Sequence, residues 1–464
     1  MKKFLGFVLS AVALTATLPA EDVSPDMSYA LGYRAYRSGL YNDAVKHFLA
    51  AASQGHAAAQ YHLGLCYAYG KGTSKDPAQA IKYFQAAADQ GDNRAQYSLA
   101  EAYNYGKGIK VNYAEAVKYY RLSAQRGNKS AMYALGVLYL YGYGVERNES
   151  EAVKYLQLAV QNGNLVAAAA LGHCYLFGNG VEKNYAKAVE CFQQAAEINL
   201  PMVWFNLGRC YYQGWGVKKD YAKAFEYLKR AADRNDRQSQ HAVATMYRSG
   251  MGVEKNYNLA FKYYKLAADQ GDRGAQYAVA ECYSCGDGVE KDYTQAVKYY
   301  RLAAAQGLAN AQYKLACCLK NGDGVEKNEI ESVKYLNLAA DQGFTPALQG
   351  MASALESGVY MEKDAQKSIQ IMRRLAAEGN QDAMISLGNR YFSGIDVQRD
   401  QDEAVKFYRM AAENGSAQGA YNLGLTYQFG MGVKADVSEA RKWYNKAAAQ
   451  GHGDAVMVLK NLQK

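Results

Sequence analysis

The chain has 464 residues, of which 50% are hydrophobic and 21% are charged, and its formal net charge is +9. This composition is typical of a soluble folded protein and argues against a disordered or membrane-embedded one. Five prolines are too few for a proline-rich linker architecture. Glycine and tyrosine are unusually frequent, with 43 and 42 copies, and both recur periodically.

The first 20 residues have the three regions of a secretory signal peptide. Lys2 and Lys3 form a basic start, an uncharged apolar run covers residues 4–16, and small residues precede Glu21. The apolar run is shorter than the roughly 20 residues that a spanning helix needs. We therefore expect cleavage after Ala20 and export to the periplasm or the cell exterior, with an uncleaved interfacial anchor as the alternative.

A period of 36 residues organises the rest of the chain. Eleven units of this length fill residues 56–451 without an insertion or deletion. Only stacked, structurally equivalent units resist changes of length so strictly, so the period predicts a solenoid. One glycine marks each unit, at Gly70, Gly106, Gly142, Gly178, Gly214, Gly250, Gly286, Gly322, Gly358, Gly394 and Gly430.

Each unit predicts a pair of helices joined by a glycine loop. In the first unit, Ala59, Leu63 and Tyr67 share one face of a helix. Gly70 and Gly72 then end that helix, because glycine accepts positive φ angles. In two later loops Tyr360 and Asp396 replace the second glycine, and we expect Asp396 to be left-handed.

The second helix of each unit is predicted from its two ends. The residue before it is Asp or Asn in all eleven units, which is the preference of a helix N-cap. It stops at glycine or, twice, at Asn199 and Asn235, since both residue types tolerate the left-handed conformation. The predicted N-caps are Asp76, Asn112, Asn148, Asn184, Asp220, Asn256, Asp292, Asn328, Asp364, Asp400 and Asp436.

The repeated string A-x-x-x-L-G-x-x-Y-x-x-G-x-G-V-x-K-[DN] resembles the Sel1-like repeat family, and residues 275–307 show it well. The resemblance implies a right-handed, all-α superhelical solenoid that serves as a protein-binding scaffold or adaptor. It divides the chain into a signal peptide (1–20), a tetratricopeptide-like capping hairpin (21–55), eleven repeats (56–451) and a C-terminal capping helix (452–464).

We call residues at equivalent positions of successive units a column, named by its number in the first unit. Most tyrosines fall in columns that we assign to helix packing. The columns of residues 58, 62, 65 and 69 vary freely and form a stripe beside the core face, which we expect to line the concave face. Aromatic and charged residues on this stripe are the candidate partner-binding residues: Tyr69, Tyr105, Tyr141, Phe177, Glu101, His173, Arg209 and Glu281. The alternative is that the aromatic rings pack against the next loop.

Lysines recur on the second helices and in the loops, but glutamates interrupt or precede them. Nucleic-acid binding needs a concentrated basic stripe, so we expect a solvated face and no nucleic-acid partner. Cys66, Cys174, Cys210, Cys282 and Cys318 share one column, whose members lie too far apart for disulfides and are expected to be buried thiols. A redox or zinc site at residues 282–285 and 317–318 is the less favoured alternative.

The motifs of common catalytic sites are missing, including Walker, His-Glu-x-x-His and Gly-x-Ser-x-Gly sequences. We therefore expect a monomeric, non-catalytic scaffold that binds a protein or peptide and needs no cofactor or metal. Two alternatives remain open. One is the penicillin-binding or β-lactamase-like activity ascribed to Hcp-type relatives, although Ser-x-x-Lys and Lys-Thr-Gly sequences are also missing. The other is a structural role in binding peptidoglycan.

Overall fold

The computed structural model describes residues 24–358 and 361–462. Over these residues the chain forms 25 α-helices, one short 3-10 helix and no strand, which confirms the all-α class and the solenoid of helix pairs. The predicted signal peptide, its cleavage after Ala20 and the position of Tyr360 lie outside the described residues. The chain divides into two compact units, Met1–Asp236 (unit 1) and Arg237–Lys464 (unit 2).

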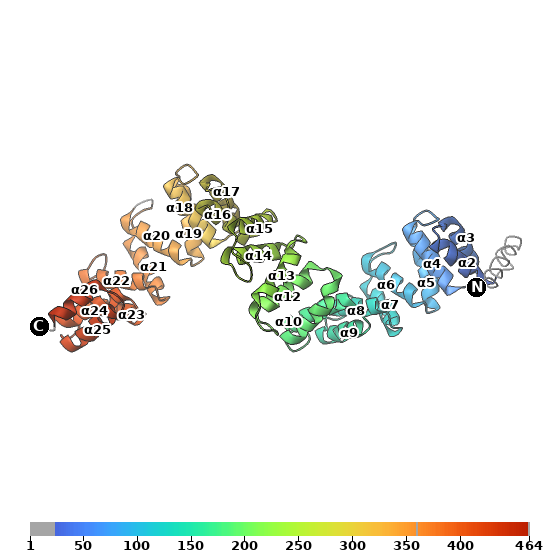
Figure 1. The fold of residues 1–464 in the computed structure, drawn as a ribbon, viewed down its shortest axis with the longest axis horizontal. Helices are drawn as coiled ribbons and strands as arrows, with labels where there is room; N and C mark the ends of the chain where they lie inside the picture. Colours follow the sequence, from blue (N-terminus) through green and yellow to red (C-terminus); the bar gives the residue numbers. More distant parts are fainter. Residues whose placement is uncertain (1–23, 359–360, 463–464) are drawn as a thin grey trace. The chain divides into compact units, whose positions relative to one another are not determined.

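Unit 1 contains six helix pairs (Figure 1). The first helices of its pairs are α2 (Pro25–Arg37), α4 (Ala57–Tyr69), α6 (Asn93–Tyr105), α8 (Lys129–Tyr141), α10 (Leu165–Phe177) and α12 (Pro201–Gln213). The second helices are α3 (Tyr41–Ser53), α5 (Pro77–Asp89), α7 (Tyr113–Gln125), α9 (Glu149–Gln161), α11 (Tyr185–Ala195, followed by the 3-10 helix Ala196–Ile198) and α13 (Tyr221–Ala232).

Unit 2 contains six further pairs and a final helix. Its first helices are α14 (Arg237–Ser249), α16 (Arg273–Cys285), α18 (Ala309–Asn321), α20 (Thr345–Ser357), α22 (Gln381–Ser393) and α24 (Ala417–Phe429). Its second helices are α15 (Tyr257–Asp269), α17 (Tyr293–Ala305), α19 (Glu329–Asp341), α21 (Ala365–Ala377), α23 (Gln401–Glu413) and α25 (Val437–Ala449), and α26 (Gly453–Asn461) follows.

Within each unit a first helix packs on the second helix of its own pair and on the second helix of the preceding pair. The leucine column fills the space between them, and Leu63, Leu99 and Leu135 are fully buried. The glycine after this leucine allows the closest approach, since a Cβ at Gly64 would lie 2.6 Å from the Phe84 ring. The core is therefore a continuous layer of apolar side chains between stacked helices.

The helix ends follow local rules that the sequence predicted. All eleven predicted Asp and Asn residues are N-caps whose side chains accept backbone N–H bonds in the first turn. Asn199, Asn235 and Asp396 are left-handed, with φ of 53°, 65° and 60°. These predictions are confirmed.

A tertiary contact explains why the second loop position is a glycine. A Cβ at Gly72 would lie 2.2 Å from the carbonyl oxygen of Tyr41, at the start of the preceding second helix. The loops that carry this glycine thus pack, within each unit, on the backbone of the preceding pair without an intervening side chain. At Asp396 the carboxylate instead accepts from Arg390, with 2.6 Å between Nη1 and Oδ2. This ion pair anchors the one described loop in which a side chain replaces the second glycine.

Candidate partner-binding surface

The four aromatic residues of the predicted binding stripe end successive first helices of unit 1. Tyr69, Tyr105, Tyr141 and Phe177 are 69%, 62%, 65% and 48% exposed. Each precedes a glycine in the left-handed conformation, which turns the chain away from the ring. The following loop contacts two of these rings, since Tyr143 stacks on Tyr141 at 5.9 Å between centroids and Lys107 Nζ lies 5.0 Å from the Tyr105 centroid. Both rings nevertheless remain largely exposed.

Sequence reasoning missed one aromatic residue at the same position. Phe429 on α24 is exposed but is separated from the others by six polar or small residues of its column. The N-terminal hairpin does not extend the series, because α2 begins 32 residues before α4, so that Arg37 holds the position of Tyr69 and the exposed Tyr33 holds that of Leu65. We call Tyr69, Tyr105, Tyr141 and Phe177 the aromatic row.

The predicted residues His173 and Arg209 stand beside the end of the aromatic row. The His173 and Phe177 rings lie 4.4 Å apart between centroids. The Arg209 guanidinium lies 5.5 Å from the Phe205 centroid and 5.2 Å from that of Trp215. Burial, and then the charge of Arg209, hold the pKa of His173 below its usual value. This end of the row combines aromatic surface with a fixed positive charge.

The two predicted glutamates have intramolecular partners. Glu101 Oε1 accepts a hydrogen bond of 2.9 Å from the hydroxyl of the buried Tyr120, and Glu281 accepts one from Tyr300. Burial and the adjacent carboxylate raise the pKa of both tyrosines. Glu101 and Glu281 thus support the core as well as bordering the stripe, a role that no sequence argument had assigned.

The same pairing recurs in four repeats, whereas the buried Tyr444 donates instead to Gln428, 16 residues earlier. A buried tyrosine on the second helix bonds to a polar side chain 19 residues earlier, as Tyr264 does with Thr245 at 3.0 Å and Tyr408 with Asn389 at 2.8 Å. In the first full repeat the ring is Phe84 and the equivalent of the polar partner is Leu65. A ring without a hydroxyl needs no acceptor, so this interval stays apolar.

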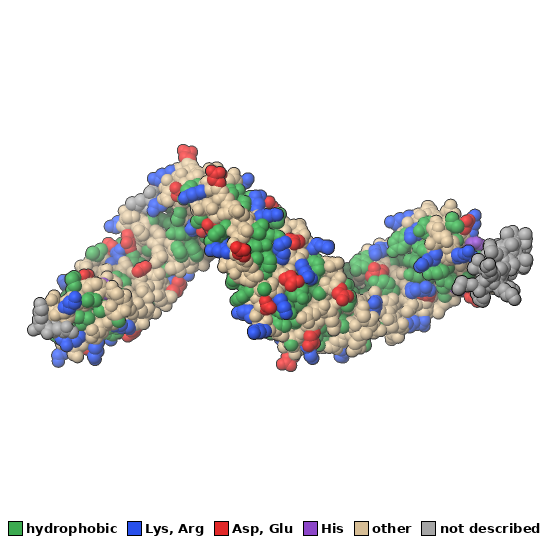
Figure 2. Space-filling model, in the orientation of Figure 1, with side chains coloured by type: hydrophobic (Ala, Val, Ile, Leu, Met, Phe, Trp, Pro, Cys, Tyr) green, Lys and Arg blue, Asp and Glu red, His purple; other side chains and the backbone are tan. Residues whose placement is uncertain are grey.

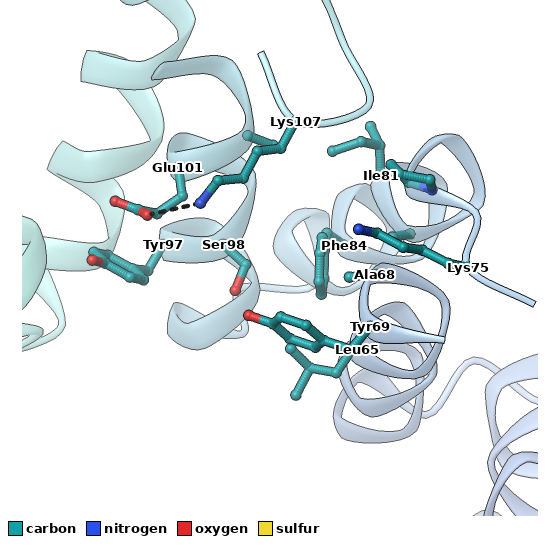
Figure 3. Close-up of a pocket in the computed structure, with 13 residues that line it drawn as sticks. Leu65, Ala68, Tyr69, Lys75, Ile81, Phe84, Tyr97, Ser98, Glu101 and Lys107 are labelled. Atoms are coloured by element: carbon teal, nitrogen blue, oxygen red, sulfur yellow. Dashed lines mark ion pairs between the residues drawn. The ribbon is translucent and has the colours of Figure 1, made fainter. Parts of the chain in front are cut away.

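A pocket lies at this interval, between α4, α5 and α6 and the loops after α4 and α6 (Figure 3). Its volume is about 500 Å³. Tyr69 of the aromatic row and Glu101 of the next repeat stand on opposite sides of it, and Lys107 reaches toward Glu101 with 3.7 Å between Nζ and Oε2. Leu65, Ala68, Tyr69, Lys75, Pro77, Ala80, Ile81, Phe84, Tyr97, Ser98, Glu101, Ala102 and Lys107 line the pocket.

In unit 2 the column of the aromatic row carries small or polar residues before Phe429, and several of them bond locally. Ser249 and Ser357 donate their hydroxyls to carbonyls of their own helices, at 2.8 and 2.9 Å. Asn321 donates to Asp323 at 3.1 Å. Of the predicted site residues only Glu281 lies in unit 2, so the structure assigns the other seven to unit 1.

Other surfaces carry mixed charge. Figure 2 shows basic and acidic side chains interspersed over the visible face. On the second helices, Lys118 and Lys154 pair with glutamates three residues earlier, at 3.2 and 2.9 Å. Tyr113, Tyr257 and Tyr293, which share the column that begins at Pro77, are partly exposed at the starts of their helices, and the Tyr113 ring stacks on Tyr143 with 5.3 Å between centroids.

The cysteine column consists of free, buried thiols, as predicted. Burial raises the pKa of Cys66 and Cys282 to about 11, which keeps both protonated and unreactive near neutral pH. Over residues 24–358 and 361–462, no group of three or more His, Cys, Asp or Glu side chains is placed to hold a metal ion. In the same part of the chain, no helix has the length and apolar character needed to cross a bilayer.

Comparison with known families gives one consistent match. The sequence model of the Sel1 repeat matches twelve segments that together span most of the chain: residues 25–56, 57–92, 93–128, 129–164, 165–200, 205–236, 237–272, 274–308, 309–344, 345–380, 381–416 and 417–452. The first segment is the N-terminal hairpin that carries Tyr33.

Solved structures of the same repeat type are similar to the chain. One is c5321, a protective antigen present in uropathogenic Escherichia coli strains that displays an SLR fold, with 31% identity, 90% of each chain covered and a TM-score of 0.77. Another is a Sel1 repeat protein from Oxalobacter formigenes, with 28% identity, 70% of this chain and 93% of the other covered, and a TM-score of 0.56. No curated protein sequence matches the chain.

Proposed function

The chain belongs to the Sel1-repeat family, and from this membership we propose that it is an exported, monomeric scaffold that binds a protein or peptide along its concave face. Repeats of this family build solenoid scaffolds that generally serve protein–protein interaction. The proposed mechanism is presentation of a preformed surface, without catalysis. A surface that is rigid before association avoids much of the ordering cost of binding.

The observation that carries the proposal is the aromatic row. Four exposed rings end four consecutive first helices, at 36-residue intervals. They remain exposed although neighbouring side chains contact three of them, and tyrosine contributes large contact area at low entropic cost. His173 and Arg209 add polar contacts at the end of the row. The row therefore supports an extended partner that contacts one ring per repeat.

Export rests on different observations. The signal-like residues 1–20 predict secretion, and the similar c5321 protein is described as a protective antigen. Together they support a location in the periplasm or outside the cell for the mature chain, residues 21–464.

Affinity capture with the mature chain tests the proposal. The variant Tyr69→Ala/Tyr105→Ala/Tyr141→Ala/Phe177→Ala removes four rings, and each aromatic anchor is worth about 1 kcal/mol or more, so binding should weaken by about 100-fold or more. Mass spectrometry would identify proteins that the wild type enriches and the variant loses, after circular dichroism has shown that both fold.

A matched control removes exposed apolar side chains from second helices. Leu122→Ala/Leu158→Ala/Leu266→Ala/Leu302→Ala changes four side chains of 38–44% exposure outside the row. It should retain the captured partner. If the wild type and the row variant capture the same proteins, or if the control loses the partner equally, the aromatic row is not the binding surface.

A further inference from the structure

The pocket between the first two full repeats combines an apolar interior with a basic rim. Leu65, Ile81 and Phe84 line the interior, and the pocket volume of about 500 Å³ is within the range of pockets that bind small ligands or side chains. Lys75 reaches in from the loop of one repeat and Lys107 from the loop of the next (Figure 3). The stem of Lys75 packs near Gly70, since a Cβ at this glycine would lie 3.3 Å from Lys75 Cβ.

Only one of the two ammonium groups lies near a carboxylate. Lys107 Nζ lies 3.7 Å from Glu101 Oε2, a long contact, and Glu101 also accepts the hydroxyl of Tyr120. Among the described residues, no carboxylate lies within 4 Å of Lys75 Nζ. The rim therefore keeps a net positive charge and a lysine that is free to bind an anion.

This pair of lysines occurs at a single interval of the sequence. At the next interval Val111 and Tyr143 hold the two positions. At two intervals of unit 2 an acid replaces the second lysine, as in Lys255 with Asp287, which in turn pairs with Arg248 at 3.6 Å. At the later intervals an apolar residue replaces it. A basic rim is thus not a general feature of the repeat, which argues that it is specific to this pocket.

An apolar interior distinguishes this interval from those that carry a tyrosine. Val137 and Leu156 form a similar apolar pair two repeats later, but Asn179 stands there in place of the second lysine. In the following repeat, and in the repeat of Tyr300, a tyrosine hydroxyl bonds to a glutamate where the first full repeat has Phe84 and Leu65. That polar pair places a carboxylate in the equivalent space, whereas the Leu65 and Phe84 pair presents only carbon atoms. The pocket can therefore bury an apolar side chain without leaving a polar group unpaired.

We propose that this pocket receives an apolar side chain, aliphatic or aromatic, of a linear peptide segment whose neighbouring Asp or Glu pairs with Lys75 and Lys107. The inference rests on the proposed function and names the sequence class of the partner. The apolar side chain gains from removal of its surface from water. The carboxylate belongs within two residues of it, because two residues of extended chain span about 7 Å. Tyr69 then stacks on the same segment where it enters the aromatic row.

Selection of a phage-displayed library of random linear heptapeptides on the immobilised mature chain tests this specificity. Enriched peptides should carry Leu, Ile, Phe or Tyr with Asp or Glu within two positions. A fluorescein-labelled enriched peptide, titrated by anisotropy, gives the Kd. Lys75→Gln/Lys107→Gln should raise this Kd about tenfold, and the peptide with Asn or Gln in place of its acid should lose about the same factor against the wild type but little against the variant.

Two further variants make the result specific. Leu65→Glu/Phe84→Tyr installs the polar pair of the next repeat and should abolish enrichment while circular dichroism stays unchanged. Lys219→Gln/Lys255→Gln changes the same loop position in two other repeats and should leave the Kd unchanged. Failure to enrich any peptide, enrichment without acidic residues, or a Kd unaffected by Lys75→Gln/Lys107→Gln each overturns the inference.

Affinity capture distinguishes a failure of the pocket inference from a failure of the proposed scaffold function. A partner that the aromatic-row variant loses but Lys75→Gln/Lys107→Gln retains at full affinity refutes the role of the pocket and leaves the scaffold function standing. A partner that both variants retain refutes binding along the row itself. Loss with both variants supports the two proposals together.

Discussion

Units 1 and 2 are built from the same repeat, yet they use its variable columns differently. In unit 1, the last residue of four consecutive first helices is an exposed aromatic ring. In unit 2, the same column holds residues such as Ser249 and Asn321, which bond to their own helix or loop. The packing columns are alike in both units. The comparison therefore shows that the helical framework can stay constant while the exposed residues of a single column change.

Unit 2 also departs from the framework once, at a charge cluster. Arg390 occupies the column of the buried cysteines and is 11% exposed as a side chain. It pairs with Glu356 and with Asp396, each at 2.6 Å, and Ser368 donates to Glu356 at 2.9 Å. The charges and hydroxyl of these four residues thus satisfy one another. In unit 1, thiols and apolar side chains fill the equivalent space.

The largest expected effect comes from breaking this cluster. Arg390→Met leaves two half-buried carboxylates without their cation and should destabilise the surrounding helices by about 3 kcal/mol. Hydrogen exchange with mass spectrometry, read over residues 345–413, measures the local free energy of opening. Adding Asp396→Gly restores the usual loop glycine and should recover part of the loss.

The control for that change lies in unit 1. Leu138→Met alters the same column without a charge and should cost less than about 1.5 kcal/mol. Equal exchange rates in wild type and Arg390→Met would show that the cluster does not stabilise unit 2.

A somewhat smaller effect is expected at the N-terminal end of unit 1, whose stability should depend on pH. His62 is buried among aromatic rings, stacked on Phe48 at 5.3 Å and edge-on to Tyr33 at 5.3 Å, and neither ring nitrogen has a hydrogen-bond partner among the described residues. Burial, reinforced by the charge of Arg94 and opposed by Asp92, lowers the pKa of His62 to about 4.

The sign of the pH effect follows from the two pKa values. The unfolded chain binds a proton near pH 6.5 and the folded chain only near pH 4, so stability from the neutral His62 is complete above pH 6.5. It declines as the pH falls toward 4, by about 2 kcal/mol at pH 5. Hydrogen exchange of α2 and α4 between pH 7 and 5, corrected for intrinsic rates, measures this loss. His62→Phe should remove the dependence, and an unchanged dependence in that variant would assign it to other groups.

The smallest effect concerns the tyrosine hydroxyls that both units share. Tyr120→Phe in unit 1 and Tyr300→Phe in unit 2 each remove a bond to a partly exposed carboxylate and should cost about 1 kcal/mol. Tyr264→Phe, whose partner is the neutral Thr245, should cost about half as much. Local opening free energies from hydrogen exchange test the ranking. A larger cost for Tyr264→Phe than for the other two would contradict a contribution from the carboxylates.

The sequence by itself determined the features that depend on nearby residues. The 36-residue period, the Asp and Asn N-caps and the left-handed Asn199, Asn235 and Asp396 are local properties of backbone and side chain, and all were predicted correctly. The burial of the cysteine column was equally predictable from the sequence, because helical periodicity places it on the core face.

Only the tertiary structure decided which variable side chains are exposed and which are engaged. Glu101 reads as a surface charge, but its partner Tyr120 stands 19 residues later on another helix. The pocket joins Lys75 and Lys107, which belong to different repeats, and its opening depends on the pair of Leu65 and Phe84. Such contacts join residues from different helices. The geometry of helix stacking, rather than the local preference of any residue, determines which side chains come into contact.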